Sequence, residues 1–248
     1  MLARVCRGWL AMLCWASSAG LLSGGPMATD SPEDVPAAVP SETRSPSCES
    51  PCTRDVLGTP AVAVEGNGVS VRVARGELFS STNATDWTKR TVPTVSRLRS
   101  VAFGNGVFVA VGDEGALVTS GDGGTWKLRK STTDERLRAV VHGAGRFVAV
   151  GYRGTILTSK DGRHWQRGES GVVERLQNVA YGNGIFIAAG WNGCVLKSLD
   201  GQTWQRSSAL DGRLERLQFL AGSFATSNDR GTTWRSGDGT GWKLADER

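Results

Sequence analysis

The stretch that decides the fold is residues 137–167, LRAVVHGAGRFVAVGYRGTILTSKDGRHWQR. The same pattern occurs in residues 98–128, LRSVAFGNGVFVAVGDEGALVTSGDGGTWKL, and in residues 176–206, LQNVAYGNGIFIAAGWNGCVLKSLDGQTWQR. One tryptophan of the pattern recurs three times at a spacing of 39 residues and once more after 38, at Trp87, Trp126, Trp165, Trp204 and Trp242. A fixed period of this length is typical of solenoids and propellers, whose repeats are single supersecondary units.

Each copy of the repeat predicts four short strands. In the copy at residues 98–128 we expect strands at 100–103, 107–111 and 116–119, with a fourth beginning near Thr125. Valine, phenylalanine and isoleucine fill these segments, glycines separate them, and a helical period of 3.6 residues is absent. Four hairpin-connected strands per repeat form one propeller blade. The sequence therefore predicts an all-β fold, a β-propeller of about five four-stranded blades.

The first and last copies are less regular. The first copy begins at Ala61 and lacks one residue relative to the others. We take the last copy to begin at Leu217, in LQFLAGSFATSNDRGTTWRSGDGTGW, so that it lacks the three residues of the Gly-x-Gly turn. Five copies are enough for a five-bladed ring, while an open arc or a dimer remains an alternative.

A turn motif, Ser-x-Asp-Gly-x-x-Trp, precedes the fourth strand of each blade. We expect its carboxylate to accept backbone N–H groups across the turn, and its tryptophan to be buried between sheets. The predicted structural residues are Asn83, Asp122, Asp161, Asp200 and Asp238, with Trp87, Trp126, Trp165, Trp204 and Trp242. A second match at Ser227–Trp234 competes in the last copy. Aligning Phe224 with Phe186 places the true motif at Ser236–Trp242 and Asp229-Arg230 at a hairpin tip.

These motifs resemble the Asp-box, or BNR repeat, of sialidase-like propellers over residues 58–248. The rhythm of the repeat is most similar to the photosystem II stability/assembly-factor-like repeat proteins. That resemblance implies a non-catalytic propeller whose arginine-bearing face binds protein. Sialidases would require an Arg-Ile-Pro motif, unique substrate arginines and a Tyr–Glu pair, and none of these stands out here. We therefore expect no enzyme activity, no catalytic residue, no metal and no cofactor, with a glycan-binding or sialidase-like hydrolase propeller as the alternative.

The N-terminal part of the chain has the pattern of an export signal and a tether. Residues 1–22 combine Arg4 and Arg7 with a short apolar run and small residues, which predicts a signal peptide. We expect an exported protein, periplasmic, secreted or associated with the cell envelope, with lipid attachment or an uncleaved anchor as alternatives. Residues 23–57 are rich in proline and serine and predict a linker, in which Cys48 and Cys52 form a disulfide or remain as two thiols.

Charge divides the chain at the same boundary. Residues 23–57 carry six acidic and two basic side chains, a net charge of −4, whereas residues 58–248 carry 25 basic and 18 acidic side chains, a net charge of +7. A basic domain suits an anionic partner. Because export separates the protein from nucleic acid, we expect the partner to be a protein or an anionic glycan. We also expect no transmembrane span in the mature chain.

The candidate binding residues lie on the face that holds the tips between second and third strands and the connections between blades. The tips share a glycine frame but vary in their other residues, which is how a scaffold presents a binding surface. An arginine also recurs before a leucine at the entry to each of the last four blades. The candidates are Arg97, Arg136, Arg175 and Arg216, with Arg99, Arg138, Tyr152, Arg153 and Trp191. The alternative is that these arginines only join one blade to the next.

Overall fold

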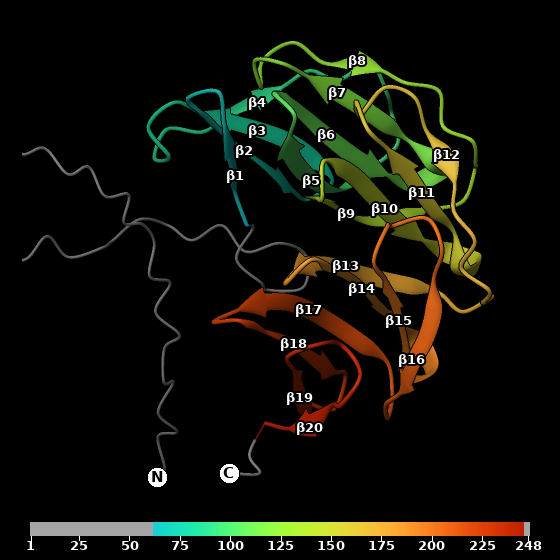
Figure 1. Cartoon of the computed structure of the whole chain (residues 1–248). Helices are drawn as coiled ribbons and strands as arrows, with labels where there is room; N and C mark the ends of the chain where they lie inside the picture. The colour runs from blue at the N-terminus through green and yellow to red at the C-terminus, as the bar shows by residue number, and fades with distance from the viewer. Residues whose placement is uncertain (1–61, 246–248) are drawn as a thin grey trace, which may run out of the picture. The chain divides into compact units, whose positions relative to one another are not determined.

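A computed structural model describes residues 62–245, and their fold is the predicted all-β propeller of five blades (Figure 1). Five antiparallel sheets of four strands follow one another along the chain. In every sheet the strands pair in chain order, so each blade is a meander of three hairpins. The predicted signal peptide and the whole predicted linker, with the Cys48–Cys52 pair, lie outside the described residues.

In each blade the first strand in the sequence is the innermost and the fourth is the outermost. The first blade consists of β1 (Val64–Gly66), β2 (Val69–Ala74), β3 (Glu77–Ser81) and β4 (Thr88–Arg90). The second consists of β5 (Leu98–Gly104), β6 (Val107–Gly112), β7 (Leu117–Ser120) and β8 (Lys127–Leu128). The third consists of β9 (Leu137–Gly143), β10 (Arg146–Gly151), β11 (Ile156–Ser159) and β12 (Gln166–Arg167). The fourth consists of β13 (Leu176–Gly182), β14 (Ile185–Gly190), β15 (Cys194–Ser198) and β16 (Gln205–Ala209). The fifth consists of β17 (Leu214–Leu220), β18 (Ser223–Asn228), β19 (Thr233–Ser236) and β20 (Lys243–Leu244).

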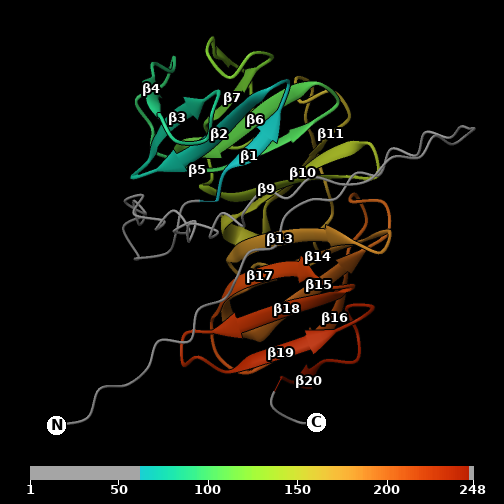
Figure 2. The same cartoon turned by 90° about the vertical axis from the view of Figure 1, so that its left-hand side faces the viewer.

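The core lies between successive blades. Four apolar clusters join the first blade to the second, the second to the third, and so on to the fifth. In each cluster a fully buried phenylalanine of the second strand packs against the preceding blade, as Phe147 does between the second and third blades. Inner strands of neighbouring blades lie beside one another, and Figures 1 and 2 show the sheets stacked in this order.

A close approach between blades explains the glycine that ends the inner strand. A Cβ on Gly104 would lie 2.0 Å from the His142 ring of the next blade, and one on Gly143 would lie 2.1 Å from the Tyr181 ring. His142 therefore occupies an aromatic position of the repeat, with its ring 4.7 Å from that of Phe147. Burial lowers its pKa, as expected for a histidine that serves as a core residue.

Apolar packing ends at the first and fifth blades. The first-blade residues aligned with Phe108, Ala110 and Val118 are Ser70, Arg72 and Phe79. These side chains alternate with those that pack on the second blade and so face away from it. The Arg72 guanidinium covers the Trp87 ring at 4.0 Å.

The outer face of the fifth blade departs from the repeat in the same way. Serine, alanine and threonine replace the residues of the fourth blade that pack on the next sheet: Ser223, Ala225 and Thr233 are aligned with Ile185, Ile187 and Val195. Among the described residues, no apolar cluster joins the fifth blade to the first.

Candidate functional site: the tip face

The turns of each blade lie on two faces, as the strand directions require. The turns between first and second strands meet the Asp-box turns on one face, here called the Asp-box face. There the Asn105 side-chain amide donates to the carbonyl oxygens of Gly145 and Lys160 in the next blade, at 3.1 and 2.8 Å. Asn67 and Asn183 make the same pair of bonds at two other blade junctions.

The Asp-box turns have one hydrogen-bond pattern in all five blades. In the third blade, Asp161 Oδ1 accepts the N–H groups of Arg163 and His164, and the Trp165 indole N–H donates to the Gly162 carbonyl. Asn83 Oδ1 accepts the corresponding N–H groups in the first blade. The Thr125 N–H and the Ser120 hydroxyl hold the pKa of the Asp122 carboxyl well below its usual range. Each of these side-chain oxygens therefore already accepts hydrogen bonds from its own turn.

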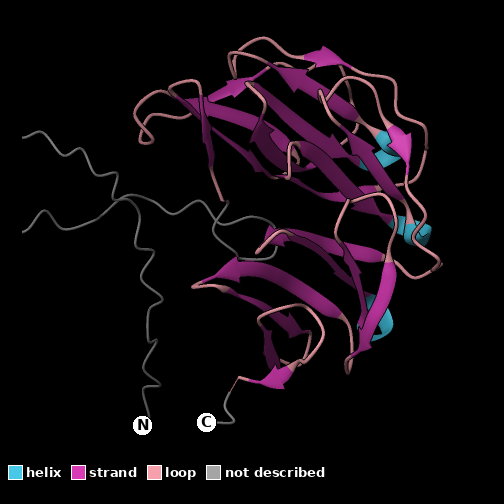
Figure 3. Ribbon diagram, in the orientation of Figure 1, coloured by secondary structure: helices cyan, strands magenta, loops and turns pink. Residues whose placement is uncertain are grey.

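The opposite face, here called the tip face, holds the tips between second and third strands together with the connections between blades. Three tips are single 3-10 turns: η1 (Asp113–Gly115), η2 (Tyr152–Gly154) and η3 (Trp191–Gly193). Figure 3 shows these turns in cyan along one side of the domain. Each turn is fixed by backbone bonds to the connection that follows, as when Gly154 N–H donates to the Glu174 carbonyl at 2.8 Å. These three turns share their backbone hydrogen bonds, and their first residue differs from blade to blade.

Arginines and aromatic rings alternate across this face in an arginine–aromatic row, which we define as Arg136, Tyr152, Arg175, Trp191 and Arg213. Tyr152 belongs to the tip of the third blade. The Arg136 guanidinium lies 5.1 Å from the centre of its ring, and the Arg175 guanidinium lies 3.8 Å from it. Arg175 also lies 4.0 Å from the Trp191 ring, and Arg213 lies 5.4 Å from it. The row spans the third, fourth and fifth blades.

Arg175 occupies the centre of the row. Its guanidinium lies between two aromatic rings, a cation–π arrangement that fixes the plane of the group. Among residues 62–245 it has no carboxylate partner and no side-chain hydrogen bond, and the side chain is only half-buried. A positioned guanidinium with unused N–H groups is a ready site for a carboxylate, which accepts two parallel hydrogen bonds from it.

At one end of the row, three arginines surround a single carboxylate. Asp113 accepts from Arg99 Nε at 2.9 Å and forms an ion pair with Arg136 Nε at 2.8 Å. Burial opposes ionisation of Asp113, but the Arg99 hydrogen bond and the charges of Arg99, Arg136 and Arg138 together lower its pKa. Burial and the charge of Arg99 lower the pKa of Arg138, whose Nε has no hydrogen-bond partner. This end of the row has excess positive charge.

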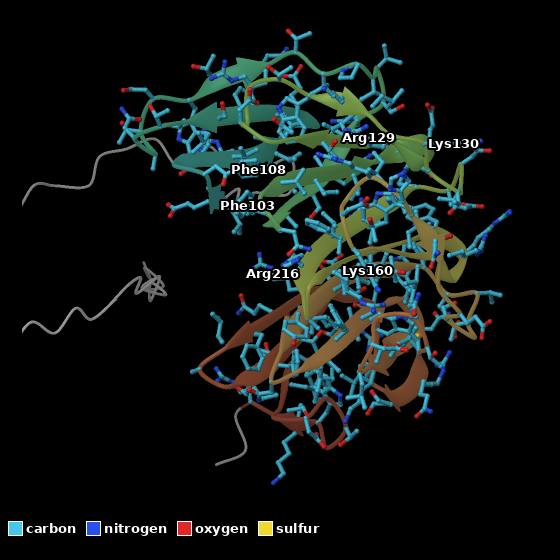
Figure 4. All side chains as sticks on the ribbon, turned by 45° about the horizontal axis from the view of Figure 1, so that its top comes forward. Phe103, Phe108, Arg129, Lys130, Lys160 and Arg216 are labelled. Carbon is cyan, nitrogen blue, oxygen red and sulfur yellow. The ribbon has the colours of Figure 1, made fainter. Side chains whose placement is uncertain are left out.

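The register of the fifth blade corrects one of the predicted residues. Leu214 pairs with Asn228 as Leu176 pairs with Gly190, so Arg213 is the residue aligned with Arg175. The prediction that Arg216 occupies this position is wrong, because Arg216 lies beyond a bulge, within β17 (labelled in Figure 4). The last copy therefore begins at Leu214, and it does not lack the turn that we expected to be missing.

Two other predicted arginines stand apart from the row. Arg97 packs over Gly76 in the first blade, whose two-residue tip carries no aromatic ring. Arg153 is exposed and forms an ion pair with Glu135 at 3.4 Å. The structure thus brings together Arg136, Tyr152, Arg175 and Trp191, with Arg99 and Arg138 close to Asp113, and leaves Arg97, Arg153 and Arg216 outside.

A hollow of about 390 Å³ lies beside the row between the fourth and fifth blades. Trp191 and Arg213 line it, together with the connection at Leu210, Asp211 and Gly212. The Trp191 indole N–H is buried and has no hydrogen-bond partner among the described residues. A ligand that reached along the row would therefore find a recess lined by the Trp191 side chain next to a cation.

Other reactive side chains are accounted for by packing. The Tyr152 hydroxyl lies 3.1 Å from Arg136 Nη1, and the Tyr181 ring stacks near Phe186. Burial raises the pKa of the Cys194 thiol to about 11. Residues 62–245 contain no group of three histidine, cysteine or acidic side chains placed to hold a metal ion. No helix in this part of the chain is long and apolar enough to cross a membrane.

The fold has counterparts of known structure. A structure of YCF48 bound to D1 peptide matches 74% of this chain and 68% of its own, with a TM-score of 0.56 and 19% identity. The chain resembles the YCF48-like repeat proteins. YCF48 from Cyanidioschyzon merolae matches with a TM-score of 0.55 and 15% identity, over 74% of this chain and 71% of its own.

A GH74 enzyme from Niastella koreensis is also similar, with a TM-score of 0.58 and 20% identity, over 75% of this chain but only 30% of the enzyme. No protein-family model and no curated protein sequence matches this chain. At these identities the likeness shows the propeller fold alone.

Sequence reasoning missed two members of the site, Arg213 and Asp113. The signal for Arg213 was present, since the segment Gly212-Arg213-Leu214-Glu215-Arg216-Leu217 contains two Arg-Leu pairs and the first is the aligned one. Asp113 is one of the variable tip residues, and nothing in its own repeat distinguishes it. Its three arginine neighbours come from two blades, so their meeting depends on how the blades pack.

Proposed function

We propose that this chain is an exported, non-catalytic propeller that acts as a protein-interaction scaffold, and that its tip face binds an acidic segment of a partner. The observation that carries the proposal is Arg175, held between the Tyr152 and Trp191 rings with no carboxylate partner in the described chain. The excess of arginine around Asp113 and the +7 charge of residues 58–248 favour an acidic partner over a neutral one. YCF48, which shares the fold, has been solved with a bound peptide.

The non-catalytic part of the proposal rests on how the carboxylates are used. The box carboxylates accept hydrogen bonds within their own turns, and Asp113 is held by arginines. Neither tyrosine has a carboxylate within hydrogen-bond distance in the described chain. A glycosidase of the sialidase type needs a tyrosine activated by a carboxylate, together with an acid. We therefore expect no turnover of a fluorogenic sialoside between pH 5 and 8.

A binding experiment with one matched control tests the tip face. The chain from residue 23 onward is titrated into a fluorescent peptide of alternating glutamate and glycine with a free C-terminus, and anisotropy is recorded. We expect Arg175→Gln to weaken binding about tenfold, since a hydrogen bond to a charged group contributes roughly 1.5–3 kcal/mol. Arg216→Gln removes the same charge outside the row and should change affinity less than about twofold at 0.15 M salt, where exposed charges are screened beyond ~8 Å.

Equal losses in the two variants would show that net charge alone attracts the peptide, and would overturn the site. An absence of peptide binding to the unmodified chain would overturn the preference for an acidic partner. Export is tested separately, by mass spectrometry of the N-terminus of the protein recovered outside the cytoplasm. A chain that keeps residues 1–22 and stays in the cytoplasm would contradict that part of the proposal.

A further inference from the structure

A groove of about 650 Å³ lies on the Asp-box face, at the junction of the second and third blades. We call it the seam groove. Its walls are the turn at Asn105 and Gly106, the strand end at Thr119 and Ser120, and the two adjoining Asp-box turns. Its cationic residues are Lys127 and Arg129 from the second blade and Lys160 and Arg163 from the third. Figure 4 labels Arg129 and Lys160 on these neighbouring blades.

The positive charge of the seam groove is a departure from the repeat. The same four positions at the other three junctions carry a single cation in total, Arg90. They are Thr88, Arg90, Gly121 and Gly124 between the first two blades; Gln166, Gly168, Leu199 and Gln202 between the third and fourth; and Gln205, Ser207, Gly237 and Thr240 between the last two. The propeller architecture therefore does not require cations here, because the other blades pack without them.

None of the four cations has an acidic partner among residues 62–245. Arg129 is held in place, because its Nε donates to the Thr119 hydroxyl at 2.8 Å and leaves its terminal N–H groups for another acceptor. Two carboxylates, Asp122 and Asp161, also line the groove, and both are bound within their own turns. The lining thus has two more positive than negative charges.

We propose that the seam groove binds a compact polyanion that carries sulfate or phosphate groups. Four cations from two blades can contact separate tetrahedral oxyanions at once, whereas a single carboxylate would leave most of them unused. The volume falls within the ~300–1,000 Å³ typical of sites for small ligands, which favours a small polyanion over a protein segment. The site lies on the opposite face from the arginine–aromatic row and does not depend on it.

Calorimetric titration of the chain from residue 23 onward tests this proposal, at 0.15 M salt. Sucrose octasulfate and inositol hexakisphosphate are the probes, and they separate a sulfated sugar from a phosphate ester as the preferred source of the oxyanion. We expect one site per chain, and at least about a tenfold loss of affinity in the double variant Lys127→Gln, Lys160→Gln. The control, Lys89→Gln with Lys243→Gln, removes the same charge outside the groove and should lose less than about twofold.

Arg129→Lys provides a second measure, since it keeps the charge but removes the planar group that Thr119 positions. It should weaken binding severalfold without lowering the melting temperature by more than a few degrees. Arg175→Gln on the tip face should leave affinity for both probes unchanged. Equal losses in groove and control variants, or no saturable binding of either probe, would overturn the proposal.

Discussion

The two faces of the propeller are built from the same repeat but differ in what varies. On the Asp-box face the box side chain of every blade, from Asn83 to Asp238, accepts the N–H group two residues further along the chain. On the tip face the second, third and fourth blades share one backbone turn, but its first side chain changes from Asp113 to Tyr152 to Trp191. In a repeat protein a constant residue is explained by the fold. A residue that departs from the repeat needs another explanation, and both proposed sites contain such residues: Tyr152 and Trp191 beside the recurring arginines, and the cations of the seam groove.

The largest expected effect is a loss of stability on replacing a tip-face glycine, compared with replacing a glycine of the Asp-box face. Gly154 on the tip face and Gly145 on the Asp-box face both have positive φ, +61° and +71°. A Cβ on Gly154 would lie 2.0 Å from the Val172 carbonyl oxygen, whereas nothing lies within 4 Å of one on Gly145. We expect Gly154→Ala to lower the free energy of unfolding by roughly 3 kcal/mol or more, and Gly145→Ala by only about 1–2 kcal/mol. Chemical denaturation measures both, and equal losses would contradict the close packing of Gly154 against Val172.

The next effect concerns the carboxylate of the Asp-box turns. Asp161→Ala removes the acceptor of two backbone N–H groups, and we expect a loss of about 1–3 kcal/mol in the free energy of unfolding. Asp161→Asn should cost much less, because Asn83 accepts the same bonds in the first blade. Binding of the acidic peptide should be unchanged in the folded fraction of both variants. A variant with normal stability and no peptide binding would contradict the structural role.

A smaller effect is the dependence of stability on pH. The Asp122, Asp161 and Asp238 carboxyls have pKa values below the ordinary 3.8, so the unfolded chain binds more protons in acid than the folded one. The stability that they contribute is complete well above pH 3.8 and falls as the pH is lowered below it. Unfolding free energies measured from pH 7 down to 2.5 should fall less steeply in the triple Asp→Asn variant. An unchanged slope would show that the turns do not control acid sensitivity.

The smallest effect distinguishes the ring of Tyr152 from its hydroxyl. Tyr152→Phe keeps the surface on which Arg175 stacks at 3.8 Å and loses only the contact with Arg136, so peptide affinity should stay within about twofold. Tyr152→Leu removes the ring and should weaken peptide binding by about fivefold, because a cation–π contact contributes ~0.5–1 kcal/mol at exposed sites and more when desolvated. If Tyr152→Phe weakens peptide binding as much as Tyr152→Leu, the hydroxyl contributes to binding and the stacked ring does not. Melting curves of both variants show whether folding is intact.

The sequence by itself determined the repeat, the blade and the Asp-box turns. A period of 39 residues with glycines between short apolar strands leaves few folds other than a propeller, because each strand and turn is specified locally. The same local information placed the last box at Ser236–Trp242, where Ser236 and Asp238 form the expected hydrogen bonds. Even the asparagine at position 83 was assigned correctly to its turn, since an amide oxygen accepts the same N–H groups.

Only the tertiary structure decided which arginine of the fifth blade belongs to the row and how charges from different blades meet. The sequence contains two Arg-Leu pairs three residues apart, and either could be the one that recurs. The β-bulge after Leu214 shows that Arg213, and not Arg216, is the aligned arginine. The stacking of Arg175 between two tips, the arginines around Asp113 and the four cations of the seam groove all join residues from adjacent blades. Such contacts depend on the separation and angle of neighbouring sheets, which the packed core sets and no single repeat encodes.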